Sequence, residues 1–399
     1  MLRVVVGGLL LQVIFGLLVL KVGYVREVFD FLSRAFVKML SFSETGAEFL
    51  FGNLVRPEFR VTFGYIFVLQ VLPTVIFFAS LTAGLYYLGV LQRVVAVVAW
   101  IMRKTLGTSG PESLCVASNI FLGQTEAPLL IKPFLMRMSR SELMAVMTGG
   151  MATMAGGVLA AYVGFLGGDD LVARQKFALH LMTASIMNAP AALVFTKLLV
   201  PETDPEATQR PLQVPVSERA GNLIEALAQG AADGLKLAAN IAAMLLAFIA
   251  VIALLNDLLL RLGRLLDLNS WIQASSGGLY AGLSLQWLLG WLFRPIAFLM
   301  GVSWNESLAV GALLGQKLVL NEFVAYAQLP SMPLSEKARI LSTYALCGFA
   351  NFSSIAIQLG GIGSLVPHRR GELASLGLRA VLGGSLAAIT SAAWVSLLL

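Results

Sequence analysis

Charged residues are scarce in this sequence. Asp, Glu, Lys and Arg make up 13% of the 399 residues, whereas hydrophobic residues make up 58% and the mean hydropathy is +0.82. A soluble domain carries about twice that fraction of charge, so the composition argues against a soluble domain. Cysteine and histidine are also rare, with two residues of each: Cys115, Cys347, His180 and His368. So few residues support neither a disulfide framework nor a Cys/His zinc cluster.

A concentrated basic surface is missing as well. The net charge of +6 is spread along the chain, whereas a nucleic-acid-binding surface needs a basic stripe, so no nucleic-acid partner is expected. The sequence instead contains long apolar stretches. They cover 2–20, 61–90, 143–168, 177–200, 235–260, 278–302, 338–366 and 373–399. Because a membrane-spanning helix needs about 20 apolar residues, most of these stretches can cross a lipid bilayer. They predict an all-α polytopic membrane protein.

An internal repeat divides the chain. Three short motifs recur after 194 residues: Leu91-Gln92 as Leu285-Gln286, Glu112-Ser113-Leu114 as Glu306-Ser307-Leu308, and Ser141-Glu142 as Ser335-Glu336. Glu126 and Glu322 are 196 residues apart. We therefore expect repeats at 91–199 and 285–399. Three predicted crossings separate their starts, and an odd number of crossings turns the second copy over in the membrane, giving inverted repeats.

Each repeat carries polar residues in an apolar setting. Gly-Gln-Thr-Glu-Ala-Pro at 123–128 lies in a segment, 110–138, that is too short and polar for a crossing, and Asn-Glu-Phe at 321–323 lies similarly in 305–330. Both segments predict re-entrant helical hairpins, each followed by an interrupted transmembrane helix. Inverted repeats with broken helices are typical of secondary transporters. A channel stays an alternative, whereas an enzyme would need a nucleophile with a base or a metal cluster, and the intramembrane residues offer neither.

At these motifs the chain resembles the concentrative nucleoside transporters. The resemblance rests on 123–128, on Asn-Glu-Phe-Val-Ala-Tyr at 321–326 and on Cys-Gly-Phe-Ala-Asn-Phe-Ser-Ser-Ile at 347–355, and it continues through Pro-Glu-Thr at 201–203 and Arg-Arg-Gly at 369–371. It implies a homotrimeric, multi-pass protein of the plasma membrane, in bacteria the inner membrane. Such a protein imports nucleosides by symport with sodium. It does so by alternating access, in which a transport domain moves against a scaffold domain.

The resemblance also implies the residues of two sites. For a uridine-like nucleoside, the expected residues are Gln124, Thr125 and Glu126 at the nucleobase, Glu322, Asn351 and Ser354 at the ribose, and Val158 and Phe349 against its apolar surface. Carboxylates accept charge-assisted hydrogen bonds from hydroxyls, and a phenyl ring covers an apolar face. For sodium, the coupling ion, the expected residues are Asn119 and Thr153, with Leu122 and Met154 acting through backbone carbonyls. No other cofactor is expected.

The resemblance assigns the remaining segments to domains. It places scaffold helices and an interfacial helix in 1–90, a cytoplasmic linker in 200–220 and a long scaffold helix in 221–270, while the two repeats form the transport domain. The likeness starts at the family's second crossing, which leaves seven crossings here. The segment 24–50 is amphipathic and predicts the helix that lies along the membrane surface.

Several residues also have plainer interpretations. Glu126 and Glu322 could be buried partners of a Lys or Arg, and either could instead titrate in a proton-coupled symporter of the same fold. Ser354 could bond to its own helix, Phe349 could be core packing, and Thr153 could be a helix hydroxyl without an ion. Glu112 and Glu306 precede helices and predict first-turn carboxylates favoured by the helix dipole.

Overall fold

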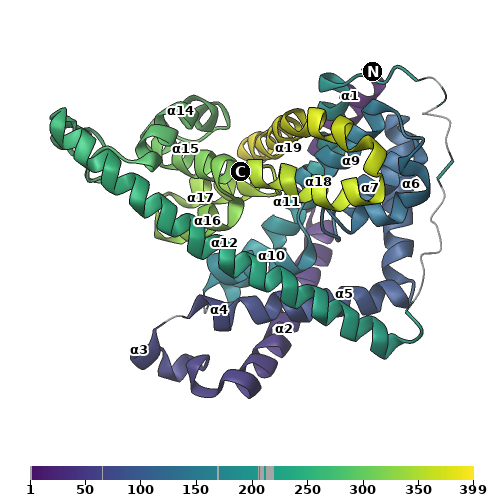
Figure 1. The fold of residues 1–399 in the computed structure, drawn as a ribbon, viewed down its shortest axis with the longest axis horizontal. Helices are drawn as coiled ribbons and strands as arrows, with labels where there is room; N and C mark the ends of the chain where they lie inside the picture. The colour runs from purple at the N-terminus through teal and green to yellow at the C-terminus, as the bar shows by residue number, and fades with distance from the viewer. Residues whose placement is uncertain (1, 65, 169, 205, 207–210, 213–219) are drawn as a thin grey trace.

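The computed structural model describes residues 2–64, 66–168, 170–204, 206, 211–212 and 220–399, and all regular elements in this part of the chain are helices (Figure 1). Most of the predicted linker 200–220 lies outside the described residues. Among the described helices, six are long and apolar enough to cross a membrane. They are α1 (Leu2–Lys21), α4–α5 (Phe67–Gln70 and Leu72–Tyr87), α9–α10 (Arg140–Ala152 and Gly156–Gly167), α11 (Leu171–Leu199), α12 (Leu223–Leu265) and α19 (Arg370–Leu398). The all-α polytopic fold is therefore confirmed.

Two apolar stretches differ from straight crossings. The stretch 338–366 is divided into α17 (Glu336–Leu346) and α18 (Phe352–Leu365), separated by a non-helical segment. The stretch 278–302 contains only α14 (Leu285–Leu299), after which the chain bends by 118° into α15 (Trp304–Val319). Gly301 provides the positive φ of 100° at this bend, a conformation that glycine adopts without a steric penalty.

The first expected hairpin is a helix–turn–helix whose two ends lie together. It consists of α7 (Gly110–Ser118), η3 (Ala127–Ile131) and α8 (Lys132–Leu135). Ser109 and Glu112 form a capping box at its start, which satisfies two otherwise unpaired backbone N–H groups. The Ser109 hydroxyl also donates to Glu142 Oε1 (2.6 Å) in the first turn of α9. The hairpin therefore leaves and returns to one end of α9.

The second hairpin has the same design. It consists of α15, α16 (Glu322–Gln328) and η5 (Leu329–Ser331). Its first-turn carboxylate, Glu306, accepts from the hydroxyl of Ser335 (3.1 Å), which caps α17. Glu112 and Glu306 are thus first-turn carboxylates, as expected.

The helices α9 and α17, which correspond in the two repeats, begin near opposite ends of α19. At the start of α19, the Arg369 guanidinium donates to the carbonyls of Leu135 (2.9 Å) and Met138 (2.6 Å), just before α9. At the other end, Lys337 Nζ donates to the carbonyl of Ser396 (3.0 Å), just inside α17. A helix of 29 residues is about 43 Å long. The repeats are therefore inverted.

The helix caps correct the predicted register of the repeat. The caps of the hairpin helices, Ser109 and Ser303, are 194 residues apart, but the caps of the following helices, Ser139 and Ser335, are 196 apart. Ser335 therefore corresponds to Ser139 rather than to Ser141. The two additional residues lie within the second hairpin, because the caps that bracket it, Ser303 and Ser335, are 32 residues apart, whereas Ser109 and Ser139 are 30 apart.

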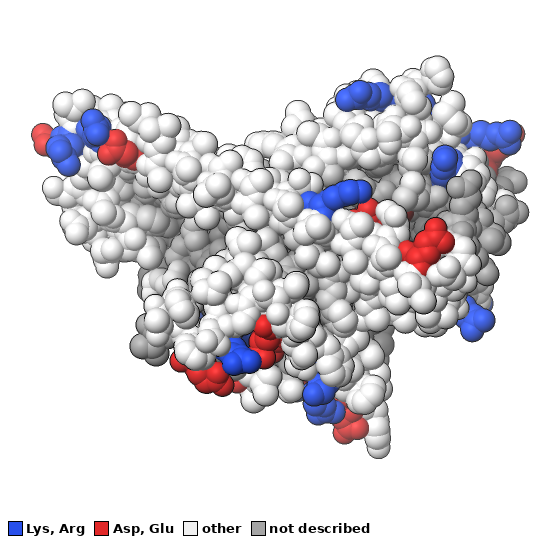
Figure 2. Space-filling view, turned by 60° about the horizontal axis from the view of Figure 1, so that its bottom comes forward, with Lys and Arg blue, Asp and Glu red and all other residues white. Residues whose placement is uncertain are grey.

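The long helix α12 packs against α5 through small residues. Its 43 residues span about 65 Å, and Figure 1 shows it running diagonally across the molecule. A Cβ at Gly234 would lie 2.8 Å from the Cα of Ile76, and one at Gly230 would lie 2.7 Å from the carbonyl of Ala79. Glycines four residues apart allow such close packing of membrane helices. Elsewhere α12 exposes leucines, and Figure 2 shows a surface on which charges form small, scattered groups.

The remaining helices complete the described fold. Helix α2 (Gly23–Phe51) buries one stripe that includes Phe36, Val37 and Leu40. The other helices are α6 (Val90–Leu106), α13 (Leu268–Ser275), α3 (Arg60–Phe63), η1 (Gly52–Leu54), η2 (Pro57–Phe59) and η6 (Pro367–Arg369). Cys115 and Cys347 are buried and form no disulfide. His180 is buried with its Nδ1 3.2 Å from the Tyr344 hydroxyl.

Candidate functional site

The two broken helices touch at their breaks. Helix α9 ends at Ala152 before α10 begins at Gly156, and α17 ends at Leu346 before α18 begins. Gly348, in the second break, has a φ of 92°, and a Cβ there would lie 2.5 Å from the carbonyl oxygen of Ala152 in the first. The crossing therefore requires glycine for both its backbone conformation and its size. Backbone groups released from helical hydrogen bonding gather here, and inside a membrane such groups must line a cavity or be buried in protein.

The tip of the first hairpin is joined to the first break. The Gly156 amide donates to the carbonyl of Phe121 (3.1 Å). Asn119, which ends α7 and is 1% exposed, donates from Nδ2 to the carbonyl of Cys115 (3.1 Å). Its Oδ1 is buried and has no hydrogen-bond partner among the described residues. An unpaired buried oxygen costs about 1–3 kcal/mol, so this atom is available to a ligand.

These segments suit a hard cation. Thr153 ends α9 in extended conformation, and its hydroxyl donates to the carbonyl of Gly149 (2.8 Å), which leaves the hydroxyl oxygen free to accept. The other expected contributors, Leu122 and Met154, offer backbone carbonyls at the tip and the break. Within the described part of the chain, no group of three or more His, Cys, Asp or Glu side chains could hold a metal ion. The donors are neutral oxygens, the ligand type that hard cations prefer.

The second hairpin contributes a buried carboxylate. Glu322, 3% exposed, is in the first turn of α16, where the helix dipole favours negative charge. It accepts from the Tyr162 hydroxyl of α10 (3.0 Å) and from Asn351 Nδ2 (2.7 Å). Asn351 in turn caps α18 by accepting from the Ser354 amide (2.8 Å). Side chains from two other segments, Tyr162 on α10 and Asn351 at the start of α18, therefore hold the Glu322 carboxylate.

Gln124 links the first hairpin to the same helix. Its Nε2 donates to Ser354 Oγ (3.3 Å), and its Oε1 accepts from Gln358 Nε2 (3.1 Å). Gln358 also donates to the carbonyl of Met147 on α9 (2.9 Å). A continuous polar path thus runs from Gln124 through Ser354 and Asn351 to Glu322. It joins the two hairpin tips beside the crossing of the breaks.

Two residues of the first hairpin lie outside this path. Glu126 is exposed and makes no ion pair with the described residues, and the Thr125 hydroxyl is 3.5 Å from its Oε1. A Cβ at Gly123 would lie 2.0 Å from Glu126 Oε2. The carboxylate is therefore folded over Gly123. The path contains no direct hydrogen bond from either residue to Ser354 or Glu322 in the described structure.

The apolar residues of the expected site are buried nearby. Val158 on α10 and Phe349 in the second break belong to one apolar cluster, which also contains Met154. The structure therefore places both against the helix breaks, and core packing accounts for their burial without a ligand.

Three residues at the site lie outside the expected set. Tyr162 stacks on Tyr326 with ring centroids 4.2 Å apart while it binds Glu322. Gln358 follows Ser354 by four residues, so helical spacing puts both on one face of α18. Lys317 on α15 is buried, and its ammonium donates to the carbonyls of Ala345 (3.0 Å) and Cys347 (3.1 Å). No ion pair joins it to Glu322 within the described residues. For Gln358 the helical spacing was the available signal; Tyr162 and Lys317 carry none.

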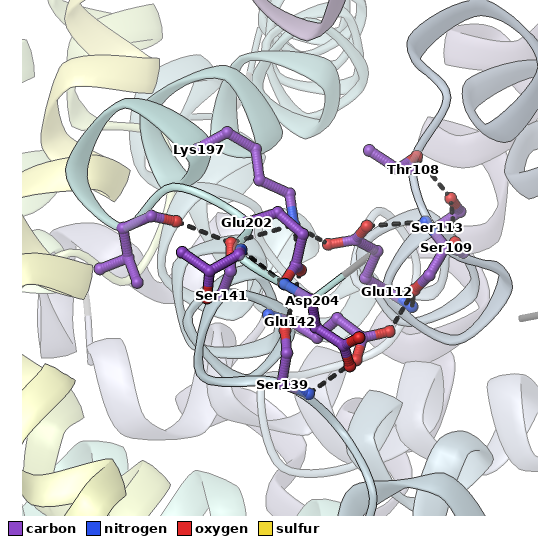
Figure 3. Close-up of polar contacts among 12 residues, drawn as sticks. Thr108, Ser109, Glu112, Ser113, Ser139, Ser141, Glu142, Lys197, Glu202 and Asp204 are labelled. Atoms are coloured by element: carbon purple, nitrogen blue, oxygen red, sulfur yellow. Dashed lines mark hydrogen bonds and ion pairs between the residues drawn. The ribbon is translucent and has the colours of Figure 1, made fainter. Parts of the chain in front are cut away.

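A charged cluster anchors the base of the first hairpin, far along α9 from the break (Figure 3). Lys197 Nζ lies 2.7 Å from Glu112 Oε2 and 3.3 Å from Glu202 Oε2. It also donates to the hydroxyl of Ser141 (3.1 Å), while the Ser139 hydroxyl donates to Glu202 (2.8 Å). This cluster ties α7, α9 and the end of α11 together.

Comparison with known proteins assigns the family. Residues 180–396, 68–169 and 1–54 match profiles described as Na+ dependent nucleoside transporter C-terminus, nucleoside recognition, and Na+ dependent nucleoside transporter N-terminus. The chain is 44% identical to an uncharacterized transporter of Bacillus subtilis over 98% of this chain and 91% of that protein. It is 42% identical to sodium/nucleoside cotransporter 1 of Mus musculus over 98% of this chain, but it spans 59% of the mouse protein.

Solved structures agree with this assignment. The structure of CNTnw in an inward-facing substrate-bound state matches with a TM-score of 0.88 and 40% identity, over 100% of this chain and 91% of that one. A CNTnw variant in an outward-facing state matches with a TM-score of 0.87 and 40% identity, with the same coverage. The structure, the family profiles and these relatives together show that the chain belongs to the concentrative, sodium-dependent nucleoside transporter family, whose members are transporters rather than enzymes.

Proposed function

We propose that this protein imports uridine-like nucleosides by symport with sodium. The observation that carries the proposal is the polar path from Gln124 to Glu322. It joins two hairpin tips at the crossing of two broken helices. A neutral solute with separate donor and acceptor edges can bridge such a path, and binding it would engage both repeats at once.

Each end of the path suits one part of a nucleoside. Gln124, with Thr125 and Glu126 beside it, offers amide, hydroxyl and carboxylate groups that can pair with a nucleobase edge. Glu322 and Asn351, next to Ser354, can accept from the ribose hydroxyls, and a carboxylate does so at charge-assisted strength. Val158 and Phe349 would cover the apolar surface of the solute.

Sodium is proposed to bind between the first hairpin tip and the first break. Its ligands would be Asn119 and Thr153 with the carbonyls of Leu122 and Met154, and the unpaired Oδ1 of Asn119 supports this choice. The hydrogen bond from the Gly156 amide to the Phe121 carbonyl, which joins the tip to the break, supports this position. An ion that orders the tip and the break would also position Gln124, two residues beyond Leu122. Nucleoside and sodium would thereby strengthen each other's binding.

Transport is proposed to follow an elevator-like alternating-access cycle. The two inverted hairpins, re-entrant with respect to the membrane, and the helices around them would form the moving domain. Helices α1, α2, α5 and α12 would form a scaffold, assembled as a homotrimer and with the base of the first hairpin on the cytoplasmic side. The close α5–α12 packing supports a rigid scaffold, and the exposed apolar residues of α12 suit lipid and neighbouring copies.

The proposal is tested by uptake of radiolabelled uridine into proteoliposomes, with sodium or choline outside. Sodium should drive uptake, and Glu322→Gln should reduce it at least tenfold because hydrogen bonds to a charged group contribute about 1.5–3 kcal/mol. Glu27→Gln is the matched control, since Glu27 is exposed on α2. Uptake driven by a proton gradient without sodium would favour the proton-coupled alternative. Flux that neither saturates nor shows counterflow would favour a channel.

A further inference from the structure

Lys317 is a buried cation with an unusual pair of partners. It is 4% exposed and lies in the last turn of α15, five residues before Glu322. Its ammonium donates to the carbonyls of Ala345 (3.0 Å) and Cys347 (3.1 Å). These carbonyls lie at the end of α17, where the helix break releases them from helical bonding. Burying an ammonium is costly unless it is hydrogen-bonded. The two carbonyls reduce this cost, but they do not explain why a lysine is buried at this position.

The inverted repeat shows what the contact corresponds to. Each broken helix, α9 with its C-cap at Thr153 and α17 with its C-cap at Cys347, follows a hairpin whose first helix begins at one of the equivalent caps, Ser109 and Ser303. In the first repeat, the proposed sodium ligands are Asn119, at the end of the first hairpin helix, and groups at the break after α9. In the second repeat, Lys317 lies in the last turn of α15, the first helix of the second hairpin. Its ammonium donates to the carbonyls at the break after α17.

The two repeats differ in one respect. Helix α7 has no basic residue in its last turn, and the Oδ1 of Asn119 has no hydrogen-bond partner in the described part of the chain. Helix α15 has Lys317 in its last turn, and there the carbonyls of the break are satisfied. Carbonyls at a helix C-terminus carry partial negative charge that favours a cation. One break therefore lies beside an unsatisfied oxygen that a diffusible cation could bind, whereas the other holds a covalently attached cation.

We propose that the Lys317 ammonium is a tethered cation that takes, in the second repeat, the place that sodium takes in the first. The inference rests on the proposed sodium symport and deepens it. With one of two equivalent cation positions filled by the chain itself, only one sodium ion binds for each nucleoside. Lys317 also lies in the same hairpin as Glu322, five residues before it, so the second hairpin is ordered without an ion from solution.

The variant-free test measures coupled fluxes of the unaltered protein in proteoliposomes. The ratio of radioactive sodium to uridine taken up should be one to one, with a Hill coefficient for sodium of about 1. A ratio of two to one would overturn the tethered-cation inference while leaving sodium symport intact. Uptake that is independent of sodium would overturn the proposed function itself, so the two failures are distinguishable.

Variants of Lys317 test the assignment to this residue. Lys317→Ala removes the ammonium and leaves space, so a second sodium should bind and the Hill coefficient should rise to about 2. In Lys317→Ala, methylammonium should restore uptake at low sodium, because it can take the place of the missing ammonium. Lys317→Met fills the space without charge and should lose uptake in a way that neither ion restores. Lys236→Ala, at an exposed lysine on α12, is the matched control and should behave as the parent.

Melting of the purified Lys317→Ala protein gives a second measurement. Methylammonium should raise its melting temperature but not that of the parent protein, in the absence of nucleoside. A Hill coefficient of about 1 in Lys317→Ala, with no effect of methylammonium on uptake or melting, would overturn the assignment. Parent-like uptake by Lys317→Met would do the same. If the variants do not fold, the flux ratio of the parent still decides the inference.

Discussion

At the scale of single residues, the site is a small set of side chains that fix one another. Asn351 caps α18 and binds Glu322 with the same amide group, Oδ1 in the first contact and Nδ2 in the second. The cap is a local requirement of the helix end, and it presents the amide N–H groups to the acid. A residue needed for folding thus also orients the carboxylate that we assign to the ribose.

Tyr162 provides a test at this scale. Its hydroxyl donates to Glu322 Oε1 (3.0 Å), while its ring stacks on Tyr326. Tyr162→Phe keeps the ring and removes the donor, so the carboxylate loses a positioning partner. The KM for uridine should rise about tenfold, because a hydrogen bond to a charged group contributes about 1.5–3 kcal/mol, while the sodium concentration for half-maximal uptake at saturating uridine should change little.

The control for Tyr162→Phe is another buried tyrosine. The Tyr280 hydroxyl has no hydrogen-bond partner among the described residues, so Tyr280→Phe should leave the KM unchanged. If both variants had the parent's KM, Tyr162 would be packing only, and its contact with Glu322 would have no part in nucleoside binding.

The sequence predicts some of these contacts and not others. Gln124, Glu322, Asn351 and Ser354 belong to motifs, and the structure brings them into one path, although their roles stay predictions. Tyr162 could not be found, because it is 160 residues from Glu322 in the chain and its neighbours on α10 are apolar. Lys317 could not be found by looking for a basic residue at the hairpin tips. It lies five residues before Glu322, and its long side chain reaches the carbonyls at the break after α17.

At the scale of elements, the breaks determine the architecture. Glycine, proline and polar residues within apolar stretches predicted the two interrupted helices and the hairpins, because such residues disfavour continuous helix in a membrane. The apolar stretch 278–302 was less informative about the path of the chain, since hydropathy does not reveal the 118° bend after α14. The register of the repeat was predicted to within two residues, and only the helix caps show that Ser335 corresponds to Ser139.

The crossing of the breaks can be tested at Gly348. Gly348→Ala would force a side chain into a φ of 92° and place its Cβ 2.5 Å from the carbonyl of Ala152. The left-handed region alone costs about 1–2 kcal/mol, and the contact with backbone cannot relax easily. We expect a lower melting temperature and at least tenfold slower uptake.

Gly360→Ala is the matched control for this prediction. Gly360 is in the middle of α18, and a Cβ there would meet nothing within 4 Å. Alanine favours a helix interior by about 0.5–1 kcal/mol over glycine, so this variant should be as stable as the parent or more so. Equal melting temperatures for Gly348→Ala and the parent would show that the two breaks separate readily and do not hold each other in place.

At the scale of the whole molecule, the site that we propose is made from two halves, one from each inverted repeat. The first hairpin and break contribute Asn119 and Gln124, while the second contribute Lys317 and Glu322. Neither half encloses the polar path alone, because the path runs between the hairpins through α18. Binding of a solute should therefore stabilise the interface between the two repeats.

Reciprocal stabilisation of the purified protein tests this coupling. If sodium orders the first hairpin tip and nucleoside then bridges both hairpins, each ligand should bind more tightly in the presence of the other, by the same factor. A ligand at about 100 times its Kd adds about 2.7 kcal/mol to the stability of the state that it binds. Uridine should therefore raise the melting temperature strongly in sodium and weakly in choline. Sodium should reach half of its own effect at a lower concentration when uridine is present. In Asn119→Ala, which removes the unpaired Oδ1, both effects should become independent of the other ligand. If uridine stabilised the parent protein equally in sodium and choline, the two sites would be uncoupled at equilibrium, and symport would then have to arise from the rates of conformational exchange rather than from shared binding energy.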